Sequence, residues 1–405
     1  MALKPLILTV NGGSSSIKFS LCEPPSGADA RPRAAVRGSV ERIGLPGTTL
    51  TYDGSDGPIE IDGGSHGDAA RTLIEHIEKL LGGVSPIGVG HRVVHGGLHY
   101  QDHQVVTDEL IAELKRTQPL DLAHLPREVA LIEEFRAGFR GVPQVACFDT
   151  AFHRGLPRVA QLLPIPRRYA DAGIRRFGFH GLSYSYLMGE LRRVAGEDAA
   201  NGRVLLAHLG SGASMAAVKG GKPVDTTMAF SPTAGLVMGT RPGDLDPGLL
   251  VYLMRTEDLT WEQMDDLVSN RSGLLGLSET TYDMRDLMER RAHDARAAEA
   301  VDLFCYQARK FAGAYAAAMG GLDTVVFAGG IGEHSPEVRA RICEGLEFIG
   351  LHLDPAANAA SASLISDETS AVTVRVLHTD EEIVIAQAVF RIVTEGRQRI
   401  SPGDR

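Results

Sequence analysis

Four short stretches of the chain place arginine, aspartate and histidine beside apolar runs. The stretch GHRVVHGG contains Arg92, ACFDTAFH contains Asp149, RRFGFHGLSY contains His180 and MGTRPGDLDP contains Arg241. Asp149 directly follows an apolar run, and the other three lie in or beside Gly- and Pro-rich segments typical of loops at strand ends. Each stretch alone is more often structural, but together they indicate a site for an anion and a metal. The same stretches also hold His91, His95, Asp244 and Asp246.

These residue types suit phosphoryl transfer. That reaction needs Mg²⁺, in-line positioning and cations around the transferred group, and little covalent help from the protein. Arg92 and Arg241 could share the acceptor and the transferred group, and a hydrogen bond from His180 would add to them. Asp149 could orient the acceptor or help to hold the metal. The stretch HTDEEIVIAQ predicts a helix that begins at Glu381, which offers a further carboxylate for Mg²⁺.

The opening stretch LILTVNGGSSSIKFSL predicts a β-hairpin. Residues 6–10 form an apolar strand, Asn11 and two glycines form the turn, and residues 16–21 form the return strand. Glycines allow close approach of the backbone, hydroxyls donate hydrogen bonds and Lys18 adds a positive charge. The hairpin therefore suits a phosphate group, and a polar turn without a ligand is the alternative.

A later stretch, VRVLLAHLGSGAS, repeats this pattern. When Asn11 is aligned with His208, Gly13 meets Gly210 and Ser14 meets Ser211. Both copies are an apolar strand, a Gly/Ser turn and a second strand. The repeat predicts two similar halves that face each other across a cleft, and a chance match of two turns is the alternative.

A third glycine-rich element, TVVFAGGIGEHSPEVRARI, predicts a strand at residues 324–327, a turn at 329–333 and then a helix. Ser335 is the expected N-cap of that helix and Pro336 its first residue. Such an element could seat a nucleotide. It lacks the third glycine of a dinucleotide-binding fingerprint, and the chain has no GxxxxGK[ST] motif, so a P-loop nucleotidase is disfavoured.

The composition narrows the class of protein. The 405 residues fit two domains or one large α/β unit, and apolar strand runs alternate with helical patterns, which favours α/β architecture. With 41 basic and 51 acidic residues the net charge is −10, so we expect no nucleic-acid or membrane partner. Four scattered cysteines and the lack of a signal peptide or membrane span predict buried thiols in a cytoplasmic protein.

The motifs taken together resemble the acetate kinase family. They are NGGSSSIKFSL, GHRVVHGG, FDTAFH, FGFHGLS, HLGSGAS, GTRPGDLDP, GGIGE and TDEE, in this order from residue 11 to residue 382. The resemblance implies two similar lobes of the actin-like ATPase (ribonuclease H-like) fold across a nucleotide cleft. It implies a first lobe of residues 1–150 completed by a helix at 383–405, and a second lobe of residues 151–382 with the nucleotide elements and dimer interface.

The resemblance also implies the reaction and the partners. The expected activity is reversible transfer of the γ-phosphoryl group of ATP to acetate, which gives acetyl phosphate and ADP. Mg²⁺ is the expected metal, with Mn²⁺ as the alternative, and the chain is expected to form a homodimer.

The resemblance implies roles for individual residues, which are matched to the family by their positions in the motifs. Asp149, His180, Arg241 and His124 match catalytic positions, and Arg92, Val94, Phe179 and Pro232 match the substrate pocket. Asn11 and Glu381 match the magnesium positions. The nucleotide positions are Lys18, Ser14, Ser16, His208, Leu209, Gly210, Ser211, Gly212, Asp283, Met284, Arg285, Gly330, Ile331, Gly332, Glu333 and His334.

Three departures from the family pattern bear on specificity. Ala123 stands where the family usually has a Leu that lines the pocket for the acetate methyl group, so a longer acyl chain could enter. Leu125 could refill that space. Ser211 and His334 each replace a usual Asn on the nucleotide side. A propionate or butyrate kinase of the same fold is therefore an alternative, and an inactive nucleotide-binding regulator is an alternative of another class.

Overall fold

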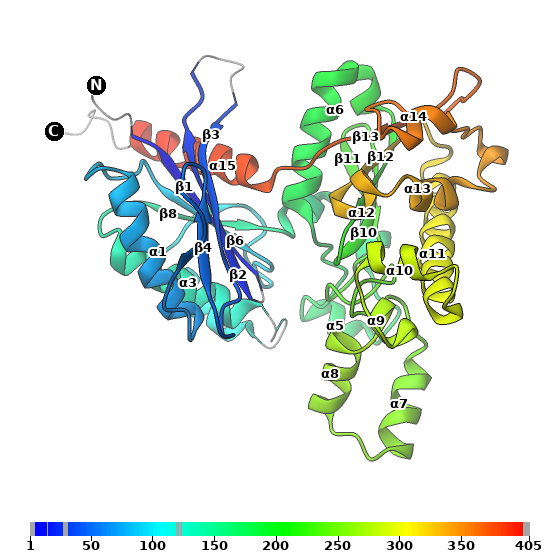
Figure 1. Ribbon diagram of the computed structural model, residues 1–405, viewed down its shortest axis with the longest axis horizontal. Helices are drawn as coiled ribbons and strands as arrows, with labels where there is room; N and C mark the ends of the chain where they lie inside the picture. The colour runs from blue at the N-terminus through cyan, green and yellow to red at the C-terminus, as the bar shows by residue number, and fades with distance from the viewer. Residues whose placement is uncertain (1–4, 14, 27–30, 119–120, 122–123, 400–405) are drawn as a thin grey trace. The chain divides into compact units, whose positions relative to one another are not determined.

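The computed structural model describes residues 5–13, 15–26, 31–118, 121 and 124–399 (Figure 1). The chain divides into two compact units. Unit 1 comprises residues 1–151 and 380–405, and unit 2 comprises residues 152–379. The chain therefore leaves unit 1 once and returns to it for its last helix.

Unit 1 is built on a mixed sheet in the order β5-β4-β3-β2-β1-β6-β8-β7. Strands β1 to β5 form an antiparallel meander, and β6 and β8 run parallel to β1. The strands are β1 (Ile7–Gly12), β2 (Ser16–Glu23), β3 (Arg33–Glu41), β4 (Thr49–Tyr52), β5 (Ile59–Glu60), β6 (Val89–Val93), β7 (Gln104–Val105) and β8 (Gln144–Phe148).

The helices of unit 1 cover both faces of this sheet. They are α1 (His66–Leu80), α2 (Asp108–Arg116), α3 (Leu125–Gly138) and α15 (Glu381–Arg399). Figure 1 shows α1 and α3 on one face and α15 on the other. The first face holds a buried apolar cluster that includes Leu8, Val10, Leu73 and Phe135. On the second face Ile385 of α15 packs against β6.

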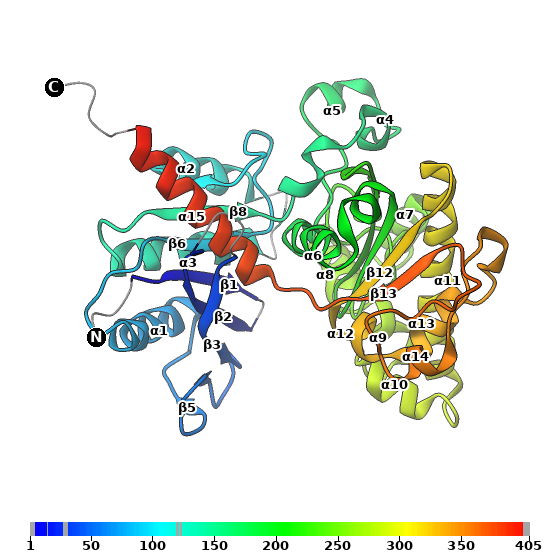
Figure 2. The same cartoon turned by 90° about the horizontal axis from the view of Figure 1, so that it is seen from above.

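Unit 2 has a five-stranded sheet in the order β11-β10-β9-β12-β13. Its strands are β9 (Arg203–Leu209), β10 (Ala213–Lys219), β11 (Lys222–Thr226), β12 (Thr324–Ala328) and β13 (Thr373–Val376). Helices α6 (Gly181–Asn201) and α11 (Ala295–Met319) lie on opposite faces of the sheet, as Figures 1 and 2 show.

The remaining short elements of unit 2 connect or extend this layered core. They are η2 (Ala151–Gly155), which spans the boundary, α4 (Arg158–Gln161), α5 (Arg167–Asp171), α7 (Pro247–Thr256), α8 (Trp261–Asn270), α9 (Gly273–Ser278), α10 (Met284–Arg290), α12 (Gly329–His334), α13 (Pro336–Cys343), η3 (Glu347–Ile349) and α14 (Pro355–Ala359).

The predicted repeat is confirmed by the topology. In each unit an antiparallel trio of strands is followed by two strands parallel to the first: β3-β2-β1-β6-β8 in unit 1 and β11-β10-β9-β12-β13 in unit 2. Asn11 and His208 occupy equivalent places, each one residue before the end of the first strand of its unit. The α/β prediction and the four buried free cysteines are likewise confirmed.

The glycine-rich element after β12 differs from the prediction. Residues 329–334 form a short helix, α12, instead of a turn, and Ser335 makes no side-chain capping hydrogen bond to α13. The reversal after the strand is confined to Gly329, whose φ of +78° lies in the left-handed region. A side chain at Gly329 would place a Cβ 2.7 Å from the carbonyl oxygen of Leu209, so the strand can pass directly into the helix only with glycine there.

Candidate active site

Arg92 and Asp149 form a buried ion pair at one edge of the unit 1 sheet. Strands β6 and β8 are parallel neighbours with Arg92 opposite Cys147, so Asp149 leaves β8 at the edge where Arg92 lies. The Nη2 atom of Arg92 donates to Oδ2 of Asp149 at 2.6 Å, and the side chain of Asp149 is fully buried. The structure therefore pairs two of the residues that the sequence assigned to one site.

Asn11 and Glu381 complete what we call the arginine–carboxylate group: Asn11, Arg92, Asp149 and Glu381. The Nδ2 atom of Asn11, in β1, donates to Oε2 of Glu381 at 3.2 Å, and the same oxygen lies 3.7 Å from Nε of Arg92. Glu381 is the first residue of α15, as the sequence predicted. Burial lowers the pKa of Arg92, but the carboxylates of Asp149 and Glu381 outweigh burial, so the guanidinium stays charged.

Glu128 is a buried acid beside this group that the sequence reasoning missed. Its Oε2 atom accepts a hydrogen bond from the backbone N–H of Val94 at 2.9 Å, and its Oε1 atom is buried without a hydrogen-bond partner in the described chain. Burial raises the pKa of Glu128 to about 7, against an opposing effect of Arg92. The signal was an acid within the apolar stripe of a helix, since Leu125 and Ile132 are buried on the same face of α3.

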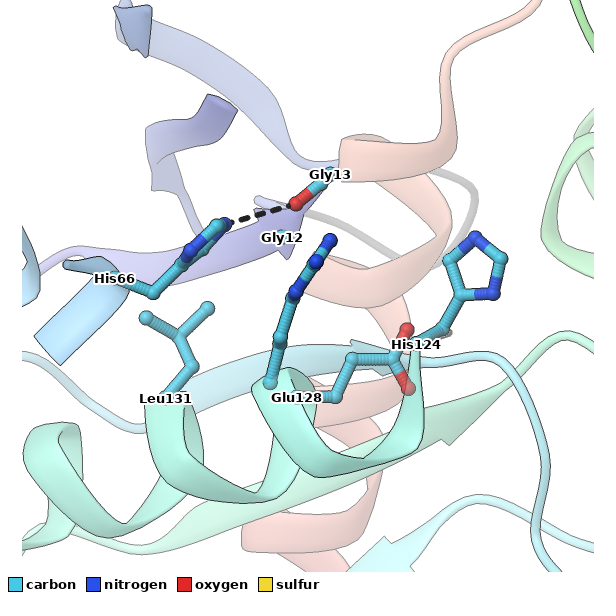
Figure 3. Close-up of a pocket in the computed structure, with 7 residues that line it drawn as sticks. Gly12, Gly13, His66, His124, Glu128 and Leu131 are labelled. Carbon is cyan, nitrogen blue, oxygen red and sulfur yellow. Dashed lines mark hydrogen bonds between the residues drawn. The ribbon is translucent and has the colours of Figure 1, made fainter. Parts of the chain in front are cut away.

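A small pocket lies between the turn after β1 and the first turns of α1 and α3 (Figure 3). Gly12, Gly13, His66, His124 and Glu128 contribute to its wall. The Nε2–H of His66 donates to the carbonyl oxygen of Gly13 at 3.1 Å, which ties α1 to the hairpin turn. The pocket therefore brings the hairpin and His124, both singled out from the sequence, to the same place in unit 1.

His124 is the N-cap residue of α3 and is held by Asp121. The backbone N–H and the Nδ1 atom of His124 both lie 3.0 Å from Oδ1 of Asp121. Asp121 is almost fully buried, so it fixes the orientation of the imidazole. Ala123, which the resemblance places in the acyl pocket, and Ser14, in the hairpin turn, lie outside the described residues.

The imidazole–hydroxyl group of unit 2 consists of His180, Ser183, His208 and Ser214. Nδ1 of His180 lies 2.9 Å from Oγ of Ser214, and Nδ1 of His208 lies 2.7 Å from Oγ of Ser183. The two imidazole rings are tilted against each other with centroids 4.4 Å apart. The β9–β10 hairpin sets this arrangement, because His208 pairs directly with Ser214. The buried hydroxyl of Tyr184 also shares a hydrogen bond with Ser214.

Arg241 reaches the same place from the loop before α7. Its Nη1 atom donates to the carbonyl oxygen of Pro232 at 2.8 Å. A Cβ at Gly212 would lie 3.2 Å from Nη2 of Arg241 and 3.4 Å from Nε2 of His180. Gly212 thus lets the guanidinium and the imidazole lie against the turn between β9 and β10, so three of the motifs singled out from the sequence meet within unit 2.

Other polar residues in the sequence motifs make structural contacts. His91 is buried, bonds Gln144 at 2.7 Å and has its pKa lowered to about 4 by burial. Asp244 accepts from the N–H of Gly235 at 2.8 Å, and Asp246 is the N-cap of α7. These positions matched a charged site by residue type, but their contacts are those of structural residues.

The positions expected to contact the nucleotide lie on several elements. Lys18 stands opposite Asn11 on β2, and Ser16 begins that strand. Asp283 caps α10 and forms an ion pair with Arg285 at 2.6 Å, which lowers the pKa of Asp283. Two further nucleotide positions, Met284 and Leu209, are almost fully buried.

The segment Gly330–His334 lies in α12, where one side chain makes two bonds. Oε1 of Glu333 accepts from the N–H of Gly329 at 2.9 Å, and its Oε2 atom lies 2.9 Å from Nδ1 of His378.

Two residues expected in the substrate pocket, Val94 in unit 1 and Phe179 in unit 2, are both almost fully buried.

Comparison with known proteins identifies the family of this chain. The model of the acetokinase family matches residues 6–387. The chain therefore belongs to the acetokinase family, and its fold is the two-lobed actin-like ATPase fold.

Particular relatives support this assignment. The chain is 43% identical to the acetate kinase of Rhodopseudomonas palustris, with 98% of this chain and 100% of the relative covered. It is 41% identical to the propionate kinase of Citrobacter rodentium, over 95% of this chain and 96% of the relative. The crystal structure of Porphyromonas gingivalis acetate kinase superposes with a TM-score of 0.85 at 35% identity, covering 96% of this chain and 100% of that one.

No helix in the described residues is both long enough and apolar enough to span a membrane.

Proposed function

We propose that this protein is an acetate kinase that transfers the γ-phosphoryl group of ATP to acetate, reversibly. The observation that carries the proposal is nearly full-length similarity to acetate kinases at about 40% identity. The buried Arg92–Asp149 pair and the placement of Arg241 beside His180 support it, since they supply the cations and hydrogen-bond donors that this chemistry requires.

In the proposed reaction a carboxylate oxygen of acetate attacks the γ-phosphorus. The new bond joins this oxygen to phosphorus, the bond from phosphorus to the β–γ bridging oxygen breaks, and ADP leaves with the electron pair. No proton is removed because acetate is already an anion. Arg92, held by Asp149, binds the acetate carboxylate, and Arg241 and His180 stabilise charge on the transferred group.

The residues fit a magnesium ion, which the family implies. Amide and carboxylate oxygens are hard ligands, and Asn11 and Glu381 lie within hydrogen-bonding distance of each other. In sites that bind nucleotide phosphates, Mg²⁺ is typically held by one or two carboxylates together with the phosphates. Mg²⁺ would neutralise charge on the phosphates, and Glu381 and Asn11 would hold it.

We assign the nucleotide contacts from the positions of these residues in the family's motifs. The turn from His208 to Gly212 and Lys18 would contact phosphates. Asp283 and Arg285, with Gly330–His334, would contact the adenosine side. Val94, Phe179 and Pro232 would surround the acetate methyl group. We further propose that the protein acts as a cytoplasmic homodimer; its four buried, unpaired thiols support a reducing compartment.

A propionate kinase is the second candidate, because relatives of that name match almost as well. The test is to trap acyl phosphate with hydroxylamine after incubation with ATP, Mg²⁺ and acetate, propionate or butyrate. The highest kcat/KM is expected with acetate. A preference for propionate or butyrate would reassign the substrate. ATP binding without activity on any short carboxylate would instead identify a nucleotide-binding regulator.

A further inference from the structure

The segment that returns to unit 1 is anchored on both sides of the boundary. The boundary falls between Thr379 and Asp380. On the unit 2 side, Oγ1 of Thr379 lies 2.8 Å from Oγ of Ser183, which also bonds His208. The residue before it, His378, bonds Glu333. The last residues of unit 2 are thus tied to two positions expected to contact the nucleotide.

On the unit 1 side, Asp380 has two partners. Its Oδ1 atom accepts from the backbone N–H of Ile383 at 3.2 Å and so caps the first turn of α15. Its Oδ2 atom forms an ion pair and hydrogen bond with Nη2 of Arg37, on β3. The side chain of Asp380 is 7% exposed and that of Arg37 is 44% exposed. A half-exposed guanidinium therefore holds an almost buried carboxylate at the start of the helix.

Glu381 follows Asp380 directly and belongs to the arginine–carboxylate group. Because Asp380 fixes the first turn of α15, it also fixes the direction in which the Glu381 carboxylate leaves the helix. That carboxylate contacts Asn11 at 3.2 Å and Arg92 at 3.7 Å.

The charges around Arg37 also favour its pairing with the carboxylates at the start of α15. Partial burial opposes its charged form, but the carboxylates of Asp380 and Glu382 outweigh burial and raise the pKa of Arg37. Loss of the guanidinium would leave two carboxylates at the helix start without this compensating charge.

We propose that Arg37 is a positioning residue: through its ion pair with Asp380 it fixes the start of α15 and thereby sets the Glu381 carboxylate against Asn11 and Arg92. The proposal deepens the proposed function, on which it rests, by assigning a residue that acts on the metal site without touching substrate. Partners of metal-binding side chains typically change metal affinity by about 10- to 100-fold when they are removed.

The test uses Arg37→Gln with Arg33→Gln as the matched control. Arg33 lies on the same strand and pairs with Glu23 at 3.4 Å, but Arg33 is well exposed and Glu23 is half-exposed, so neither carboxylate nor guanidinium of this pair is buried. Two quantities are measured in the full-length protein: the affinity for ADP with and without Mn²⁺, by calorimetry and by electron paramagnetic resonance of Mn²⁺, and the Mg²⁺ concentration for half-maximal activity.

Arg37→Gln is expected to weaken Mn²⁺–ADP binding about tenfold or more and to leave metal-free ADP binding unchanged. The Mg²⁺ concentration for half-maximal activity should rise by the same factor. The KM for acetate should change less than about threefold, because the ion pair between Arg92 and Asp149 is unaffected. Arg33→Gln should match the wild type. Arg37→Lys should recover part of the loss, because it restores the charge without the planar fork.

Asp380→Asn gives a second, independent variant. It keeps an oxygen to cap Ile383 but loses the ion pair, so it should reproduce the effect of Arg37→Gln, and the double variant should show no further loss. If Arg37→Gln lowers only the Tm, or binds Mn²⁺–ADP as Arg33→Gln does, the inference is overturned. Failure of the proposed function would appear separately, as no acyl phosphate from any carboxylate in the wild type.

Discussion

The two units use one strand arrangement to build two different electrostatic environments. At the end of β1, unit 1 gathers formal charges: Arg92, Asp149 and Glu381 around the neutral amide of Asn11. At the equivalent end of β9, unit 2 gathers imidazoles and hydroxyls beside a single guanidinium, that of Arg241, with His208 in the place of Asn11. A buried ion pair is costly to break because it leaves one charge unpaired, whereas a set of side-chain hydrogen bonds loses one bond for each partner removed. We therefore expect unit 1 to depend on charge balance and unit 2 on hydrogen-bond continuity.

The largest effect should come from removing the two arginines one at a time. Both Arg92→Ala and Arg241→Ala should lower kcat/KM by about 10³-fold or more. Arg92→Ala leaves the fully buried Asp149 without this guanidinium and should cost about 3–5 kcal/mol in the free energy of unfolding, while Arg241→Ala should cost about 1 kcal/mol. Urea denaturation and the hydroxamate assay measure the two effects. Equal losses of stability would remove the proposed contrast between the units.

The second effect is a pH dependence of stability that Glu128 confers on unit 1. Burial raises its pKa from 4.5 to about 7 in the folded state, so the folded protein binds the proton more tightly than the unfolded chain. Stability from this group is fully present below pH 4.5 and is lost as the pH rises through about 7, by about 3 kcal/mol in total.

Glu128→Gln keeps an oxygen for the N–H of Val94 and removes the titration. The difference in unfolding free energy between this variant and the wild type should therefore grow in favour of the variant from pH 5 to pH 8. Thermal or urea unfolding at both pH values measures it. A constant difference across this range would show that Glu128 does not titrate as its burial predicts.

The third effect tests hydrogen-bond continuity in unit 2. Ser214→Ala removes a partner from both His180 and Tyr184, so we expect a loss of about 1–3 kcal/mol in stability. The kcat should fall while the KM for acetate stays close to that of the wild type, because Arg92 is untouched. Steady-state kinetics and denaturation check this. An altered KM with an unchanged kcat would contradict the assignment of His180 to the transferred group.

The smallest effect concerns the neutral amide at the end of β1. Asn11→Asp replaces the donor to Glu381 with a carboxylate, which brings two like charges together and changes the site offered to Mg²⁺. The Mg²⁺ dependence of activity should change several-fold more than the KM for acetate. Kinetic titrations with Mg²⁺ and with acetate compare the two. Equal changes in both would argue against a metal role for Asn11.

Much of the candidate site follows from sequence alone because it lies at strand ends. A charged residue directly after an apolar strand emerges at one edge of the sheet, and parallel neighbours bring such residues together. The sequence assigned Arg92 and Asp149 to one site, and the structure pairs them; the repeat predicted the matching hairpins around Asn11 and His208. The same reasoning overcounted polar residues such as His91, since a motif shows residue type and not the direction of the side chain.

The α/β class, the two similar units, the hairpins and most of the polar residues gathered in each unit could therefore be predicted from the residues and their spacing. The partners became visible only in the folded chain: Glu128 bonds the backbone of Val94, Ser214 bonds His180, and Arg37 pairs with Asp380. Local spacing and periodicity set which elements form and which face is apolar. Pairing of side chains from elements far apart in the chain depends on how those elements pack, and packing is a property of the folded protein.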